Sequence, residues 1–167
     1  MSATARSSGI RPAYAVDGCD VLESPSLVGS GRRLVVDERA EATPVDESLA
    51  VVPGRVNAHS HAFQRTIRGR TEYLAPGRTK DDFWSWRERM YRAALELGAD
   101  AFEAVARLAF LEMLRAGFTT VGEFHYVHHD RDGQPYAEPN ELARRVIRAA
   151  DDVGIRIALL RTAYHRA

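Results

Sequence analysis

The sequence predicts an α/β fold with parallel strand pairing from residue 53 onward. Three segments of strand length alternate with segments that repeat apolar residues at helical spacing. Strands separated by helices pair in parallel, because each helix returns the chain to the same edge of the sheet. The expected strands are residues 56–61, 118–124 and 155–160.

Residues 1–52 have a different character, rich in Ser, Gly, Asp and Glu, with turn signals outnumbering alternating apolar residues. Short apolar runs favour edge-like strands in a small sheet, although partial disorder is the other interpretation. We therefore expect an N-terminal β-rich or partly disordered segment at 1–52 and an α/β portion at 53–167. The apolar runs are residues 13–16, 20–22, 33–36 and 49–52.

Composition is that of an ordinary globular protein. The chain has 167 residues, 45% of them hydrophobic and 28% charged, and a formal net charge of +0. A neutral chain gives no indication of binding to nucleic acid or to an anionic membrane. Cys19 is the only cysteine, which excludes an intrachain disulfide. With no secretory signal in residues 1–14 and no apolar run of ~18–20 residues, we expect a cytoplasmic protein.

Two helices are expected between the first and second strands. Residues 81–95 place Trp84, Met90 and Tyr91 at helical spacing, and a clearer helix covers residues 101–116. For the second helix, the sequence predicts an N-cap at Asp100, a capping box completed by Glu103 and a stop at the following glycine.

The second half of the chain repeats the strand–helix alternation. Residues 118–124 are β-branched and aromatic, which is typical of a strand. A third helix is expected at 141–153, with Asn140 as cap and Gly154 as stop. Residues 155–160 are strongly apolar, which predicts a strand buried on both faces.

His59-Ser60-His61 ends the first expected strand. Side chains two positions apart on a strand share a face, so the two imidazoles can hold one metal ion, while Ser60 points the other way. A bound metal would indicate hydrolysis by activated water. Histidines often only satisfy hydrogen bonds. The carboxyl end of a strand favours a site here, since α/β barrels carry their active sites there.

A second polar cluster, residues 123–130, follows the second expected strand. One interpretation is that His125, His128, His129 or Asp130 completes the metal shell. The favoured interpretation is that they make hydrogen bonds around the site or in a loop. Adjacent His128 and His129 would point apart in an extended segment, so at most one could easily share the site.

Arg87 lies among aromatic residues of the first expected helix. Aromatic residues at this spacing are more often core than pocket, but an arginine among them can bind a carboxylate through two hydrogen bonds. Gln64, three residues after His61, either faces a ligand or is an ordinary loop residue.

Three stretches together resemble the amidohydrolase superfamily of metal-dependent hydrolases, and more narrowly its formimidoylglutamate deiminases. The H-x-H motif alone fits the whole superfamily, whereas the three stretches in this order are narrower. The resemblance covers residues 53–167, roughly two-thirds of the chain, and implies an incomplete TIM-type (β/α) barrel preceded by part of a small β-rich domain. The stretches are residues 57–65, 83–91 and 123–137.

The resemblance also implies a site. It gives one zinc ion with His59 and His61 as two ligands, and Gln64, Arg87 and Tyr126 as substrate-binding residues. Enzymes of this kind hydrolyse N-formimidoyl-L-glutamate to N-formyl-L-glutamate and ammonia in histidine degradation. The expected partner is therefore a small acidic molecule, with no nucleic acid and no membrane. A homodimer is one assembly open to the full-length protein.

Two departures qualify the resemblance. A complete barrel needs about 250 residues, so we expect this chain to be an N-terminal portion that is inactive alone. Its remaining metal ligands and its catalytic residues would lie beyond Ala167. Residues 1–52 match the family only loosely. Two alternatives stay open: another deaminase or amidine hydrolase of the superfamily, which would not need Arg87, and a non-catalytic α/β binding module.

Overall fold

The computed structural model describes residues 9–164 except 32, 47, 75–76 and 78–81. The chain divides into two compact units, Met1–Pro53 and Gly54–Ala167. Among the described residues, no helix is both long enough and apolar enough to cross a membrane.

The first unit contains two small sheets built from short strands. One has the order β5-β4-β1-β6 and the other β3-β2-β7. The four apolar runs noted in the sequence correspond to β2, β3, β5 and β7. The other three strands were not predicted, because each has only three or four residues and no clear alternation. The strands are β1 (Gly9–Arg11), β2 (Tyr14–Asp17), β3 (Asp20–Glu23), β4 (Leu27–Ser30), β5 (Arg33–Val36), β6 (Ala42–Pro44) and β7 (Ala50–Val51).

The second unit is built on a three-stranded parallel sheet. Its strands are β8 (Arg55–Ser60), β9 (Phe118–His125) and β10 (Arg156–Arg161), in the order β10-β9-β8. The predicted parallel pairing is confirmed. Gly122 lets β8 approach β9 closely, since a Cβ there would lie 2.7 Å from the Ala58 carbonyl oxygen.

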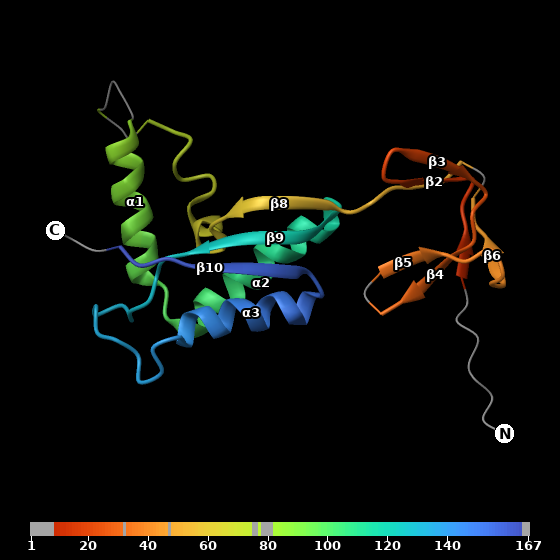
Figure 1. Ribbon diagram of the computed structural model, residues 1–167. Coiled ribbons are helices and arrows are strands. Elements are labelled where there is room, and N and C mark those ends of the chain that lie inside the picture. The colour runs from red at the N-terminus through yellow and green to blue at the C-terminus, as the bar shows by residue number, and fades with distance from the viewer. Residues whose placement is uncertain (1–8, 32, 47, 75–76, 78–81, 165–167) are drawn as a thin grey trace. The chain divides into compact units, whose positions relative to one another are not determined.

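Three α-helices and one 3₁₀ helix are described in this unit. Helices α2 (Ala99–Arg115) and α3 (Glu141–Val153) lie together on one face of the sheet, and α1 (Phe83–Glu96) lies past the carboxyl ends of the strands (Figure 1). The 3₁₀ helix η1 (Ala62–Ile67) follows β8 directly. The predicted first residue of α1, Asp81, lies outside the described residues. Asp82 caps this helix by accepting the backbone N–H groups of Trp84 and Ser85.

The predicted capping box of α2 is wrong. The N-cap is Gly98, two residues earlier, so Asp100 already lies inside the first turn. Its carboxylate pairs instead with Arg145 of α3 at 2.6 Å. Glu103 is buried and pairs with three arginines, listed below with the α2–α3 interface, so neither acidic side chain is available to cap. The predicted stop is right, because Gly117 follows the helix with a left-handed φ of 84°.

The core of this unit lies between the helices and the sheet. Its most buried members include Phe102 and Phe110 of α2, Val121 of β9 and Val146 of α3. The prediction that residues 155–160 are buried on both faces is wrong. Burial alternates along β10, because α3 covers one face of this outer strand while the side chains on the other face are exposed. The sequence of β10 is therefore more apolar than its burial among the described residues requires.

Candidate active site

The two histidines of the H-x-H motif meet at the carboxyl end of β8. The Nε2 atoms of His59 and His61 lie 2.9 Å apart, with the ring planes at 89° to each other. His61 Nδ1 lies 2.9 Å from the carbonyl oxygen of Phe124 in the neighbouring strand. Since only the Nδ1–H can donate to a carbonyl, this contact leaves the lone pair of neutral His61 on Nε2. Both rings thus present Nε2 to the same point.

The electrostatics of His61 favour metal binding. Burial lowers the pKa of its imidazole, because a partly desolvated ring resists protonation; the Phe124 carbonyl raises the pKa, and the neighbouring His59 lowers it further. The ring is therefore neutral at pH 7, which is the state that binds a metal ion.

The histidine pair fits two positions of a metal shell. Two imidazole nitrogens facing one point suit Zn²⁺, which accepts histidine nitrogen readily. Within residues 9–164, apart from the gaps given above, no group of three or more His, Cys, Asp or Glu side chains is arranged to hold a metal ion. The described part of the chain thus supplies two donors, whereas catalytic zinc sites use three protein ligands and a water.

Gln64 and Tyr126 come together beside the histidines. The Gln64 amide donates to the Tyr126 hydroxyl at 2.9 Å, and that hydroxyl contacts the sulfur of Met90 in α1 at 3.1 Å. The ring of Tyr126 packs edge-on against His61, with centroids 5.1 Å apart. Burial raises the pKa of Tyr126 to about 12, so its phenol is protonated and able to donate at neutral pH.

Arg87 lies on α1, one turn before Met90 and Tyr91. Its guanidinium donates to the Tyr91 hydroxyl at 2.9 and 3.1 Å and stacks over the rings of Trp84 and Tyr91. No ion pair of Arg87 occurs among the described residues. Neutral aromatic side chains therefore position the Arg87 guanidinium, and its positive charge is available to bind an anion.

The histidines after β9 make local contacts. His128 Nε2 hydrogen-bonds the Thr162 carbonyl at 2.7 Å, and the backbone of His129 pairs with that of Pro135. Asp130 accepts the hydroxyl of Tyr136 at 2.9 Å. These contacts are those expected from the hydrogen-bonding interpretation of the cluster.

His125 differs from these neighbours because it is buried. Burial lowers the pKa of its ring to about 4, and the charges of His128 and Arg161 act in the same direction. Its Nε2 has no hydrogen-bond partner in the part of the chain that the structure describes.

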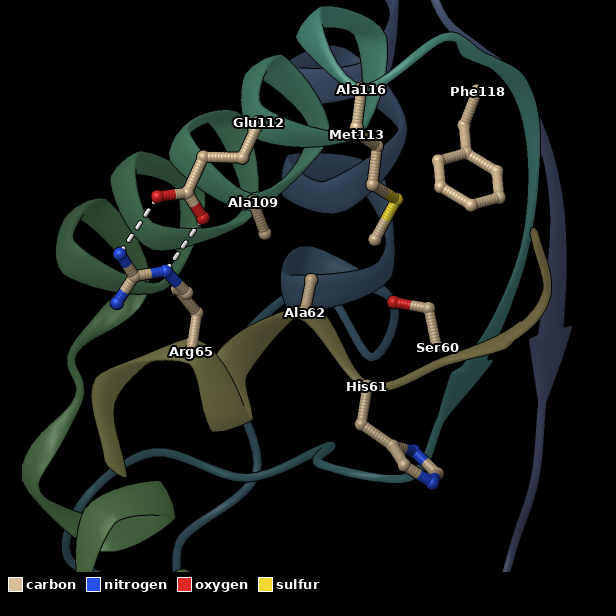
Figure 2. Close-up of a pocket in the computed structure, with 9 residues that line it drawn as sticks. All are labelled: Ser60, His61, Ala62, Arg65, Ala109, Glu112, Met113, Ala116 and Phe118. Atoms are coloured by element: carbon tan, nitrogen blue, oxygen red, sulfur yellow. Dashed lines mark hydrogen bonds and ion pairs between the residues drawn. The ribbon is translucent and has the colours of Figure 1, made fainter. Parts of the chain in front are cut away.

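A hollow of about 340 Å³ lies between η1 and α2. Its lining is mostly apolar, with Ala109, Met113 and Phe118 among its residues, and the ion pair of Arg65 and Glu112 forms one side at 2.6 and 2.7 Å. Figure 2 shows the ring of His61 directed away from this hollow. Ser60 and His61 are nevertheless among the residues that line the hollow, so it adjoins the histidine pair.

Sequence reasoning gave no role to Glu123, which lies buried on β9 beside the strand that leads into the histidine pair. The signal was present, because a carboxylate stands among the apolar residues of a strand, where an unpaired charge is costly. The pattern alone does not say which atom the carboxylate would contact.

The part of the chain that contains these site residues is similar to known proteins. The model of one protein family, described as "Amidohydrolase family", matches residues 50–167. Over 118 residues the chain is 50% identical to formimidoylglutamate deiminase of Pseudomonas aeruginosa, covering 71% of this chain and 26% of that protein. Over 122 residues it is 34% identical to a 5-methylthioadenosine/S-adenosylhomocysteine deaminase of Haloarcula marismortui, covering 70% of this chain and 26% of that protein.

A solved structure gives the same result for the fold. The crystal structure of an amidohydrolase from Brucella melitensis matches with a TM-score of 0.78 and 42% identity, covering 91% of this chain and 34% of that one. The chain thus spans about a quarter of the length of these curated relatives and a third of this solved chain.

Proposed function

Because the chain belongs to the amidohydrolase family, whose members are metal-dependent hydrolases, we propose that it is part of a formimidoylglutamate deiminase. Such an enzyme hydrolyses N-formimidoyl-L-glutamate to N-formyl-L-glutamate and ammonia. The observation that carries the proposal is the meeting of Gln64 and Tyr126 beside the histidine pair, with Arg87 one helical turn from Met90, which touches both. The 50% identity to a deiminase of this name supports it.

His59 and His61 would hold a zinc ion through their Nε2 atoms. When bound, zinc supplies Lewis acidity that activates water for hydrolysis near neutral pH. The low pKa of His61 keeps its nitrogen free of a proton, and the Phe124 carbonyl keeps its ring turned with Nε2 outward. His59 would supply the second nitrogen, since its Nε2 lies 2.9 Å from Nε2 of His61.

The other residues of the site would bind the acidic substrate. Arg87 carries a charge with two parallel donors, which matches the geometry of a glutamate carboxylate. The protonated Tyr126 phenol is a donor, and the Gln64 amide offers both a donor and an acceptor. Together they would fix the substrate with its formimino carbon near the histidines. Deimination adds water to that carbon and breaks its bond to the nitrogen that leaves as ammonia, which requires a proton donor. We expect the longer protein to supply it.

The role of Arg87 is tested by substitution in the longer protein. We expect Arg87→Ala to raise the KM for formimidoylglutamate about 10- to 100-fold, because hydrogen bonds to charged groups contribute about 1.5–3 kcal/mol. Arg92→Ala is the control, since Arg92 is exposed on the same helix and lies on a different turn. Steady-state kinetics with ammonia release as the signal measures both. An unchanged KM in Arg87→Ala would contradict a carboxylate-binding role.

A different deaminase of the same family is the second candidate, favoured by the 34% identity to the Haloarcula enzyme. Ammonia release from formimidoylglutamate, compared with release from methylthioadenosine, separates the two. A non-catalytic binding module remains a third candidate, and a longer protein that purifies without any divalent metal would favour it. The 167-residue chain alone is expected to release no ammonia, because its described residues supply only two metal donors.

A further inference from the structure

Glu123 is a buried carboxylate at the carboxyl end of β9. Only 2% of its surface is exposed, and no ion pair neutralises it among the described residues. Glutamate is almost never fully buried unless a partner compensates for the lost hydration. A glutamate that loses its hydration in this way needs a specific hydrogen-bond partner, and the contacts of Glu123 identify that partner.

The partner is the backbone that follows the histidine pair. Glu123 Oε1 accepts the backbone N–H of Ala62 at 2.6 Å, within the buried interior. Ser60 stands opposite Glu123 in the strand register and is also buried. Burial raises the pKa of Glu123, and the Ala62 N–H and the Ser60 hydroxyl act in the opposite direction. Oε2 has no hydrogen-bond partner among the described residues.

The two faces of the motif are therefore held separately. Figure 2 shows the Ser60 side chain and the His61 ring leaving the backbone in opposite directions. On the ring side, the Phe124 carbonyl binds His61 Nδ1. On the backbone side, Glu123 binds the N–H of the next residue, Ala62. Consecutive residues of β9 thus fix consecutive residues of the chain where β8 ends and η1 begins.

We propose that Glu123 is a positioning residue for the histidine pair. Its Oε1 anchors the Ala62 N–H, which sets the backbone at His61 so that Nε2 meets Nε2 of His59. The proposal rests on the metal centre proposed above. A merely structural carboxylate would stabilise the unit without affecting the orientation of the imidazole or the affinity for metal.

The test compares three variants of the 167-residue chain. Glu123→Leu removes the acceptor, Glu123→Gln keeps an oxygen for Ala62, and Val121→Ala is the control. Val121 is fully buried two residues earlier on the same strand, and Val121→Ala weakens the core without touching the Ala62 contact. Thermal unfolding checks that Val121→Ala and Glu123→Leu remain folded.

The first readout is Zn²⁺ affinity, which is measured from the NMR signals of the two imidazoles during a titration with Zn²⁺. Outer contacts of metal ligands typically change affinity about 10- to 100-fold. We expect Glu123→Leu to weaken binding at least about tenfold, and both Glu123→Gln and Val121→Ala to stay within about threefold of the wild type. Equal affinity in Glu123→Leu and Val121→Ala would overturn the proposal, as would equal loss in Glu123→Gln and Glu123→Leu.

The second readout needs no metal and separates this proposal from the metal centre itself. Nitrogen-15 shifts of His61 should show the Nδ1–H tautomer in the wild type and a mixture in Glu123→Leu. Hydrogen exchange should show the Ala62 amide protected in the wild type. An Ala62 amide that exchanges as fast as an open loop would refute the anchoring role even if Glu123→Leu fails to fold. A wild-type chain that binds no Zn²⁺ but keeps both signals would count only against the metal centre.

Discussion

At the scale of single residues, the end of β9 combines a base and an acid that are both buried. His125 lies two positions after Glu123, and 3% and 2% of their surfaces are exposed. The interior resists charge on either side chain, so burial lowers the pKa of His125 and raises that of Glu123. Burial of these two ionisable side chains therefore costs stability at the pH values where the charged form is favoured in water.

His125 makes stability depend on pH. In the folded chain its pKa is about 4, whereas its ordinary value is 6.5. Below pH 6.5 the unfolded chain therefore takes up a proton that the folded chain does not, and the free energy of unfolding falls as pH falls toward 4. We expect a loss of up to about 3 kcal/mol across this window, measured by urea unfolding at several pH values.

The matched variant is His125→Leu, which removes the titrating ring. Its free energy of unfolding should change less than that of the wild type between pH 6.5 and 4. Equal slopes in the two proteins would show that the buried ring is not the source of the acid sensitivity.

At the scale of elements, α2 and α3 are joined by charged side chains as well as by the core. Glu103 of α2 pairs with Arg107 at 2.8 Å and with Arg145 and Arg148 of α3 at 3.0 and 3.2 Å. The side chain of Glu103 is 10% exposed, whereas those of the arginines are 22–54% exposed. The buried carboxylate of Glu103 thus forms ion pairs with three arginines that are partly exposed to solvent.

Removing that acid should loosen the α2–α3 contact. We expect Glu103→Ala to lower the free energy of unfolding by about 1–3 kcal/mol, less than a fully buried pair because the arginines can recover water. Asp152→Ala is the control: Asp152 binds Arg107 at the exposed rim, and exposed pairs contribute about 0–1 kcal/mol. Similar losses in both variants, measured by chemical unfolding, would contradict the central role of Glu103.

At the scale of the whole molecule, no described strand pairs with the outer edges of the parallel sheet. The outer strands are β8 and β10, and they expose Val56 by 64% and Leu160 by 50%. Open strand edges with apolar side chains pair readily with other chains. We expect the isolated 167-residue chain to self-associate. Sedimentation velocity would measure the association.

Charged residues at those edges should reduce the association. The double substitution Val56→Lys and Leu160→Lys places a lysine on each outer strand, which disfavours edge pairing. A wild-type chain that sediments as a single monomeric species would contradict the expectation, and so would a double variant that associates to the same extent.

Local sequence patterns accounted for the α/β unit well. Helix α3 has the predicted bounds, and the glycines after α2 and α3 end their helices as expected. These features depend on neighbours within a few residues, so a single sequence contains them. The strands β1 and β6 were missed because their pairing with distant segments, rather than their own composition, makes them strands. Strand β4 pairs mainly with the neighbouring β5, and it was missed because its four residues show no clear alternation.

For the site, the sequence by itself determined that His59 and His61 share a face, because the two-residue period of a strand is a local property. Only the tertiary structure decided what surrounds them. Glu123 and Phe124 reach the motif across more than sixty positions of chain, and Tyr126 reaches Gln64 in the same way. Such contacts follow from strand register and from the path of the helices between strands, which no local pattern specifies.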